Sequence, residues 1–439
     1  MTALQYRKSI PRYLVLRTLG RRWPSLYTSR VAPIGLRELP EPRLPAPDWV
    51  RVRPIMSGIC GSDLATLCAK GSAYLSPLTS APFVVGHEIV GTVTELGPQA
   101  SGVSVGDRVV VQPALGCVVR GIEPLCDACR TEHPALCRNV TRGCISAGIQ
   151  TGYCRDTGGG WSTSLVAHTS QLYRVADALD DAVAVLAEPF ACSLHAVLRA
   201  VPDVAPVPPR AAREGLRADT TESGQRGPAG VRQTALVVGC GSIGLLTIAA
   251  LRASGWSDRI VAVAKYAHQR EHAERLGADR VLDAAGSVDQ RYRALAEALN
   301  AELYRPELGR PTVIGGADFT FDCVASPASI DDCLRFTTAG GTMCLVGMPG
   351  IPAGIDWTTI WFKELTVRAS YAYGVETVDS QRRPTFSLAL DLLQKYADRL
   401  RVLVGEPFLL CEFRSALRQA LSVGASRSVK TVFRCHPAP

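Results

Sequence analysis

Residues 234–264 have the sequence TALVVGCGSIGLLTIAALRASGWSDRIVAVA, in which an apolar run, a glycine turn, a long apolar helix and a second apolar run follow one another. The segment 268–284, HQREHAERLGADRVLDA, predicts a further helix and strand. Strand candidates at 318–324 and 342–346 are separated by helical stretches. This alternation predicts an α/β domain with a doubly wound parallel sheet.

The glycine turn in this segment has the pattern Gly-x-Gly-x-x-Gly, between a strand and the start of a helix. Gly239 would permit the tight turn, Gly241 would let the backbone approach a pyrophosphate, and Gly244 would allow close packing of helix on strand. The helix N-terminus would then face the anion. We expect a nicotinamide dinucleotide here rather than a purely structural turn, held by Gly239, Gly241, Ser242, Ile243 and Gly244.

The end of the second strand bears on the choice of cofactor. Where an acidic residue would hold the ribose hydroxyls of NAD, the chain has Ala264 and Lys265, with Arg270 close behind. A cation here can pair with a 2′-phosphate. These three residues favour NADP over NAD, and the alternative is that Lys265 is a solvated loop residue.

A β-rich region from about Val50 to Val111 contains a second constellation, SGICGSD at 57–63 and VGHE at 85–88. Its Cys60, His87 and Glu88 make a plausible open zinc site, where a free coordination position would accept a substrate oxygen. Glu188, in LAEPF, could complete or exchange within this set, and Asp63 could hold the free nitrogen of His87. Taken singly, Cys60 and His87 would be ordinary buried residues.

A third group, Cys126-x2-Cys129-x7-Cys137, has the spacing of a closed structural zinc site. Its fourth ligand is open between Cys117 and Glu123. A redox-active Cys-x-x-Cys pair is the alternative, but no thioredoxin-like βαβ pattern surrounds it.

Composition sets the broad class of the protein. The 439 residues, 47% of them hydrophobic, are enough for two domains. The net charge of +8 is divided among 48 basic and 40 acidic residues without a long basic run, so we expect no nucleic-acid partner. The N-terminus shows neither a signal-peptide core nor a membrane anchor, and fifteen cysteines suggest metal ligands and buried thiols. We therefore expect a cytoplasmic protein without a membrane partner.

Together these patterns resemble the zinc-containing alcohol dehydrogenase family, a branch of the medium-chain dehydrogenases/reductases. The resemblance runs from about Leu36 to Phe433 and rests on SGICGSDL, GHEIVGTVTELG, AEPFACSLHAV and KELTVRASYAYG. It implies a GroES-like catalytic domain, built from both ends of the chain, and a Rossmann cofactor domain. The expected divisions are 1–200 with a zinc lobe at about 117–137, a flexible insertion at 201–230, a cofactor domain at 231–355 and a return at 356–439.

The resemblance also implies roles for single residues. Glu188 before a proline is similar to the polyol, threonine and glucose dehydrogenase branch, Ser62 would pass the substrate proton onward, and Lys430 would neutralise the pyrophosphate. Two departures stand out: Ala65 replaces the histidine often found in the family's proton relay, and Glu123 replaces the usual first cysteine of the zinc lobe.

The resulting hypothesis is a zinc-dependent enzyme that interconverts a polyol, sugar or amino alcohol with its carbonyl form, using NADP or NAD, and forms a homodimer or homotetramer. One alternative keeps the fold without the catalytic zinc, as an NADPH-dependent quinone or enoyl reductase. A second alternative is a non-catalytic binding protein that uses the cysteine lobe.

Overall fold

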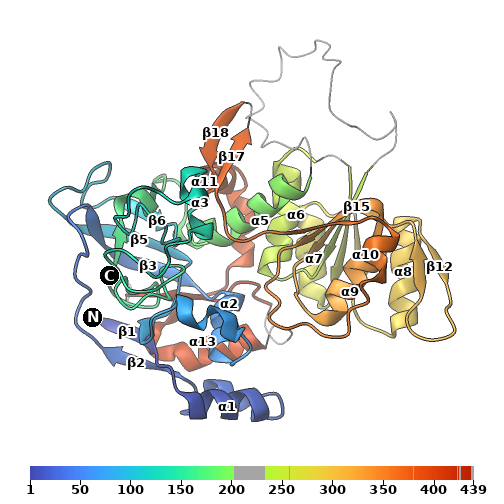
Figure 1. Ribbon diagram of the computed structural model, residues 1–439, viewed down its shortest axis with the longest axis horizontal. Coiled ribbons are helices and arrows are strands. Elements are labelled where there is room, and N and C mark those ends of the chain that lie inside the picture. Colours follow the sequence, from blue (N-terminus) through green and yellow to red (C-terminus); the bar gives the residue numbers. More distant parts are fainter. Residues whose placement is uncertain (202–232, 257, 379, 423, 425–426, 437–439) are drawn as a thin grey trace. The chain divides into compact units, whose positions relative to one another are not determined.

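The computed structural model describes residues 1–201, 233–256, 258–378, 380–422, 424 and 427–436 (Figure 1). The predicted insertion lies, from residue 202 on, outside the described residues. The chain divides into two compact units. The catalytic unit comprises Met1–Ala191, Ala372–Val375 and Pro384–Pro439, and the cofactor unit comprises Cys192–Tyr371 and Glu376–Arg383.

The cofactor unit is built on a six-stranded parallel sheet in the order β11-β10-β9-β14-β15-β16. By chain position within the sheet this is the order 3-2-1-4-5-6 of a dinucleotide-binding fold, which confirms the predicted fold class. The strands are β9 (Thr234–Val238), β10 (Arg259–Ala264), β11 (Arg280–Asp283), β14 (Ala317–Asp322), β15 (Thr337–Leu345) and β16 (Thr366–Ala369).

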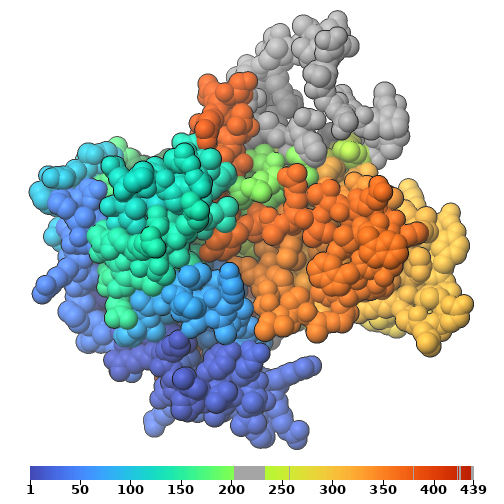
Figure 2. Space-filling model, in the orientation of Figure 1, coloured from blue at the N-terminus to red at the C-terminus, as the bar shows by residue number. Residues whose placement is uncertain are grey.

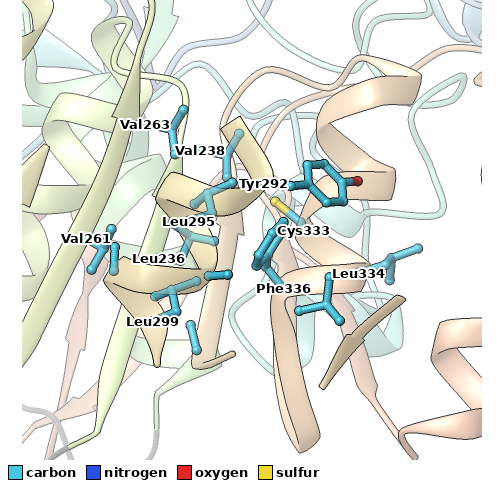
Figure 3. Packing of buried hydrophobic residues seen from close by; sticks show 14 of the residues in the cluster. Leu236, Val238, Val261, Val263, Tyr292, Leu295, Leu299, Cys333, Leu334 and Phe336 are labelled. Atoms are coloured by element: carbon cyan, nitrogen blue, oxygen red, sulfur yellow. The ribbon is translucent and has the colours of Figure 1, made fainter. Parts of the chain in front are cut away.

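Helices flank this sheet (Figure 1), and an apolar core holds them to it. Figure 3 shows Leu236 and Val261 from the strands facing Leu295 and Phe336 from two helices. Each fully buried side chain of this kind contributes about 1.5–3 kcal/mol, so the core fixes the strand ends that carry the glycine turn. The helices are α6 (Ser242–Ala253), α7 (Ala267–Leu276), α8 (Val288–Leu299), α9 (Pro327–Phe336) and α10 (Thr358–Phe362).

The catalytic unit contains a seven-stranded sheet in the order β19-β20-β3-β5-β6-β8, with β7 paired to β3. β20 comes from the C-terminal end of the chain and pairs with β3, so distant segments complete one sheet. The strands are β3 (Trp49–Gly58), β5 (Ile89–Leu96), β6 (Arg108–Val111), β7 (Leu165–His168), β8 (Leu172–Arg174), β19 (Phe408–Leu409) and β20 (Val432–Arg434).

Smaller elements complete both units. A three-stranded sheet joins β1 (Thr2–Tyr6), β2 (Ile34–Glu38) and β4 (Phe83–Val84), and two hairpins pair β12 (Glu302–Tyr304) with β13 (Thr312–Ile314) and β17 (Val375–Val378) with β18 (Gln381–Pro384). The remaining α-helices are α1 (Ile10–Leu19), α2 (Gly61–Leu67), α3 (Asp127–Arg130), α4 (Asp181–Ala184), α5 (Ala187–Ala200), α11 (Thr385–Lys395), α12 (Ala397–Leu400) and α13 (Phe413–Leu421).

Candidate functional site

The glycine turn joins β9 to α6 in the cofactor unit. Gly239 has φ +93°, a left-handed conformation that favours glycine. A Cβ on Gly244 would lie 1.7 Å from the Gly239 carbonyl oxygen, so this glycine permits the close packing of helix on turn. A Cβ on Gly241, at the N-cap of α6, would meet nothing within 4 Å, which leaves space in front of the helix N-terminus for an anion. Ser242 and Ile243 form the first turn of α6.

The strand end that bears on cofactor choice carries an acidic neighbour. Ala264 is the last residue of β10 and pairs in register with Asp283 at the end of β11. Lys265 follows it and is exposed, with its ammonium 5.5 Å from the Tyr266 ring centroid. The Arg270 guanidinium lies 2.9 Å from the Asp283 carboxylate. The two basic residues thus differ, since Lys265 is solvated and Arg270 already has an anionic partner.

The cysteine lobe of the catalytic unit brings four thiols together. The sulfur atoms of Cys117, Cys126, Cys129 and Cys137 all lie within 4.8 Å of one another, and the Cys117 and Cys137 sulfurs are 3.5 Å apart. A tetrahedron with Zn–S bonds of about 2.3 Å has sulfur-to-sulfur edges of about 3.8 Å, so the lobe fits a closed zinc site. Cys117, not Glu123, is therefore the fourth member.

Backbone and side-chain amides donate hydrogen bonds to sulfur atoms of this lobe. The amide N–H of Cys117 donates to the Cys129 sulfur at 3.3 Å, and the Asn139 side-chain amide donates to the Cys117 sulfur at 3.2 Å. Although burial opposes it, backbone N–H groups of Arg138 and Cys129 lower the pKa of Cys126 to about 6. Such donors to ligand atoms are typical of zinc–thiolate centres.

A buried cation supports the same lobe. The Arg120 side chain is fully buried, and its guanidinium donates to the carbonyl oxygens of Leu115, Arg142 and Gly148 at 2.9, 2.8 and 2.7 Å. Burial lowers its pKa, and neighbouring thiols, Cys154 first, oppose that change. The fork of donors ties together the chain before and after the four cysteines.

The predicted catalytic residues Cys60, Ser62 and His87 come together at the start of α2. Cys60 is the N-cap residue of this helix, and the Ser62 hydroxyl lies 3.3 Å from Nε2 of the buried His87. His87 Nδ1 lies 3.3 Å from a carboxylate oxygen of the fully buried Asp63. Burial would lower the pKa of His87, but Asp63 and Cys60 raise it well above its usual value.

Glu88 and Lys430 form a buried ion pair in the catalytic unit. The Lys430 ammonium also donates to the Ile59 carbonyl oxygen at 3.1 Å. The other Glu88 carboxylate oxygen has no hydrogen-bond partner among the described residues. The ammonium that we expected at the pyrophosphate is thus engaged beside Cys60, and its role toward the cofactor stays a prediction.

The buried Glu188 lies in the first turn of α5. Burial lowers the pKa of Lys430, but Glu88, then Cys60 and Glu188, raise it, so all three residues interact electrostatically with this ammonium. Among the described residues, only the cysteine lobe has its ligand atoms within 4.8 Å of one another. The ligand atoms of Cys60, His87 and the glutamate are therefore farther apart than those of the cysteine lobe. Their sulfur, nitrogen and oxygen donors nevertheless suit a zinc held by three protein ligands.

Tyr153 is a candidate site residue that no sequence motif indicates. It is buried, its hydroxyl lies 3.2 Å from the Thr66 hydroxyl, and its ring centroid is 6.0 Å from that of His87. Burial raises the pKa of Tyr153, while hydrogen bonds with Thr66 and Ser62 lower it. Nothing in the spacing marks this residue, because it follows Cys60 by more than ninety positions.

Comparison with known proteins agrees with this geometry. Residues 46–177 match the family model of the alcohol dehydrogenase GroES-like domain, and residues 242–395 match that of the zinc-binding dehydrogenases. The probable diacetyl reductase 2 ((R)-acetoin forming) of Saccharomyces cerevisiae is 30% identical over 332 residues, which cover 71% of this chain and 67% of that protein.

Two further proteins are similar. The L-threonine 3-dehydrogenase of Pectobacterium atrosepticum is 25% identical over 77% of this chain and 76% of its own. The crystal structure of 2R,3R-butanediol dehydrogenase from Bacillus subtilis aligns with a TM-score of 0.67 and 24% identity, covering 100% of this chain and 99% of that one, which shows the shared fold.

The chain therefore belongs to the zinc-binding alcohol dehydrogenase family of medium-chain dehydrogenases/reductases. It is an oxidoreductase of the alcohol dehydrogenase type that depends on zinc and NAD(P). The predicted GroES-like and Rossmann folds are confirmed. No helix among the described residues combines the length and apolar character needed to cross a membrane.

Proposed function

We propose that the protein interconverts a secondary alcohol of the polyol, sugar or amino alcohol class with its carbonyl compound, with hydride passing between the carbinol carbon and a nicotinamide. The observation that carries this is that the half-buried Cys60 interacts electrostatically with both the buried His87 and the buried Lys430, and that the buried Glu188 also acts on Lys430. The names of three relatives refer to acetoin, threonine and butanediol. In each of these compounds the carbon that bears the hydroxyl is bonded to a second carbon that bears oxygen or nitrogen. This vicinal arrangement is the substrate class that we assign.

Cys60, His87 and Glu188 would hold the catalytic metal. Zinc bound there would act as a Lewis acid that lowers the pKa of an alcohol and polarises a carbonyl. Asp63 orients His87 through its second ring nitrogen. Glu88 is the other candidate carboxylate, but it forms an ion pair with Lys430. This pairing favours Glu188 as the zinc ligand and leaves Glu88 to orient Lys430.

A hydroxyl chain supports proton removal. Ser62 would accept the substrate proton while giving its own to Tyr153, Tyr153 would likewise give its proton to Thr66, and Thr66 would release a proton to water. These hydroxyls would take the place of the histidine that the family often uses in its proton relay, because this chain has Ala65 at that position. In the reverse direction the same chain returns a proton to the carbonyl oxygen.

The exposed Lys265 supports a preference for NADP, because its ammonium is free to meet a 2′-phosphate. The Arg270–Asp283 ion pair would then orient the cofactor rather than neutralise its 2′-phosphate. Replacing Lys265 with Asp tests this: kcat/KM for NADPH should fall relative to that for NADH, and an unchanged ratio would remove the assignment. The cytoplasmic location and the dimer or tetramer stay predictions.

The test of the reaction uses purified zinc-loaded enzyme with NADP⁺ or NAD⁺ and a panel of vicinal diols, sugars, amino alcohols and simple alcohols. We expect oxidation of vicinal substrates that disappears in Cys60→Ser. Rapid reduction of quinones or enones by NADPH that persists in Cys60→Ser would instead support the zinc-free reductase.

A further inference from the structure

The N-terminal segment carries the entire excess charge of the protein. Residues 1–37 contain eight basic residues and no acidic one, which leaves 40 Lys and Arg against 40 Asp and Glu in the remainder. All eight are exposed, and none forms an ion pair with a described residue. They are Arg7, Lys8, Arg12, Arg17, Arg21, Arg22, Arg30 and Arg37.

Helix α1 lies within this segment and uses one side to attach to the catalytic unit. Leu16 is buried in a small cluster with Tyr27, Cys68 and Ala69. Gly20, one turn further on, is also buried, and a Cβ there would lie 2.5 Å from the Tyr27 ring. The helix is therefore docked along its Leu16 side, with a fixed orientation.

The exposed surface of α1 carries large apolar side chains among its basic ones. Ile10 and Leu14 are 69% and 53% exposed, and Val15 and Leu19 are 36% and 40% exposed; the members of each pair are four positions apart. Trp23, after the helix, is 50% exposed. Figure 2 shows this dark blue segment standing out from the surface of the catalytic unit.

A second exposed apolar element lies beside the segment. The Lys8 ammonium donates to the Ser76 hydroxyl at 2.7 Å, in the short 3-10 helix Ala73–Leu78. Tyr74 and Leu75 of that helix are 83% and 43% exposed. Large apolar and aromatic groups rimmed by unpaired cations thus extend over two elements.

We propose that this surface, residues 7–23 with Tyr74 and Leu75, binds the face of an anionic phospholipid membrane. A lipid interface accepts apolar and aromatic side chains at the acyl boundary while its headgroups pair with Arg and Lys. A second copy of the chain would bring two uncompensated basic segments within a Debye length of about 8 Å, which is repulsive. A nucleic acid would match the cations but not Ile10, Leu14 and Leu19.

Such an association differs from insertion of a spanning helix, since no helix among the described residues is long and apolar enough to cross a membrane. It would be peripheral and reversible, since a single docked helix presents few apolar groups and relies on charge for affinity. It does not rest on the proposed reaction, because no residue of the surface belongs to the candidate active site.

The test is sedimentation of the full-length, zinc-loaded protein with vesicles of phosphatidylcholine alone or containing about one third phosphatidylserine. We expect binding to the anionic vesicles only, weakening as salt rises. Arg17→Glu/Arg21→Glu/Arg22→Glu should bind on the order of a hundredfold more weakly. Leu14→Ser/Leu19→Ser should bind on the order of tenfold more weakly while the charge is unchanged.

The matched control is Arg275→Glu/Arg293→Glu/Arg399→Glu, which makes the same charge change at exposed positions elsewhere. It should retain vesicle binding, and all variants should retain the circular dichroism spectrum. Equal loss in the control, or no effect of the Leu14 and Leu19 changes, would overturn the proposal. Absence of binding to anionic vesicles even at low salt would also overturn it and leave an acidic protein as the occupant.

Discussion

The Cys117 sulfur lies 3.5 Å from the Cys137 sulfur, although the two residues are 20 positions apart in the chain. The backbone turns back at this point, because the Ile122 N–H donates to the Cys117 carbonyl oxygen at 3.0 Å. The turn directs Cys117 toward the Cys-x-x-Cys pair and makes the four-thiolate set complete without Glu123.

The first prediction concerns this fourth ligand. Cys117→Ser should release the lobe zinc and lower the melting temperature, since a structural zinc contributes folding free energy directly. Glu123→Ala and Cys144→Ser should keep both zinc content and melting temperature. Loss of zinc in Glu123→Ala would assign the fourth position to the carboxylate instead.

The glycine turn gives a prediction that separates binding from stability. Gly241→Ala adds a methyl group where nothing lies within 4 Å, so the melting temperature of the apoenzyme should not change. NAD(P)H affinity, measured by fluorescence titration, should fall on the order of tenfold because the methyl group occupies the approach of the pyrophosphate.

Gly244→Ala is the matched variant. Its methyl group would collide with the Gly239 carbonyl oxygen, so this change should lower the melting temperature even without cofactor. If Gly241→Ala left affinity intact, the dinucleotide would not bind over this glycine.

Lys363 gives a prediction for pH dependence. This buried ammonium donates to the Arg335 and Thr337 carbonyl oxygens at 2.6 and 2.8 Å, and burial, then Arg335, lowers its pKa to about 8. The unfolded chain therefore binds more protons between about pH 8 and 10.5, so this group's contribution to the free energy of unfolding rises with pH across that window.

Urea denaturation across this window checks the sign. In the wild type the free energy of unfolding should include a contribution that rises with pH. Lys363→Met should remove this contribution, whereas Lys70→Met, at an exposed position, should leave it unchanged. A contribution that falls between pH 8 and 10.5 would contradict the lowered pKa.

The hydroxyl chain makes a kinetic prediction. Tyr153→Phe removes the group between Ser62 and Thr66 and should lower kcat on the order of ten- to a hundredfold with little change in KM. Thr66→Val should act in the same direction and more weakly, because Tyr153 still receives the proton. Unchanged kcat in Tyr153→Phe would place the proton path elsewhere.

Local chemistry explains what the sequence could predict. The turn at Gly239 and Gly244 depends on backbone conformation and on contacts within a few residues, so the motif determines it. The alternation of apolar strands and helices likewise determines the parallel sheet, since each element must bury one face. The zinc lobe was predictable for three of its four ligands, which lie close together in the sequence.

Long-range pairing explains what it could not predict. Lys430 and Glu88 are 342 positions apart, and only the pairing of β20 with β3 brings them together. Tyr153 reaches Thr66 across 87 positions through the packing of a loop that has no motif. The exposure of apolar residues on α1 could not be predicted either, because the same residues are expected of a core helix. Only the buried position of Leu16 shows which side of the helix is covered.

The most direct test of a catalytic zinc at Cys60 is elemental analysis of zinc per chain in the wild type, Cys60→Ser and Cys117→Ser, with alcohol oxidation measured on the same samples. Two zincs in the wild type, one in each variant, and loss of activity with retained melting temperature in Cys60→Ser would support a catalytic zinc at Cys60. An unchanged zinc content in Cys60→Ser would contradict it.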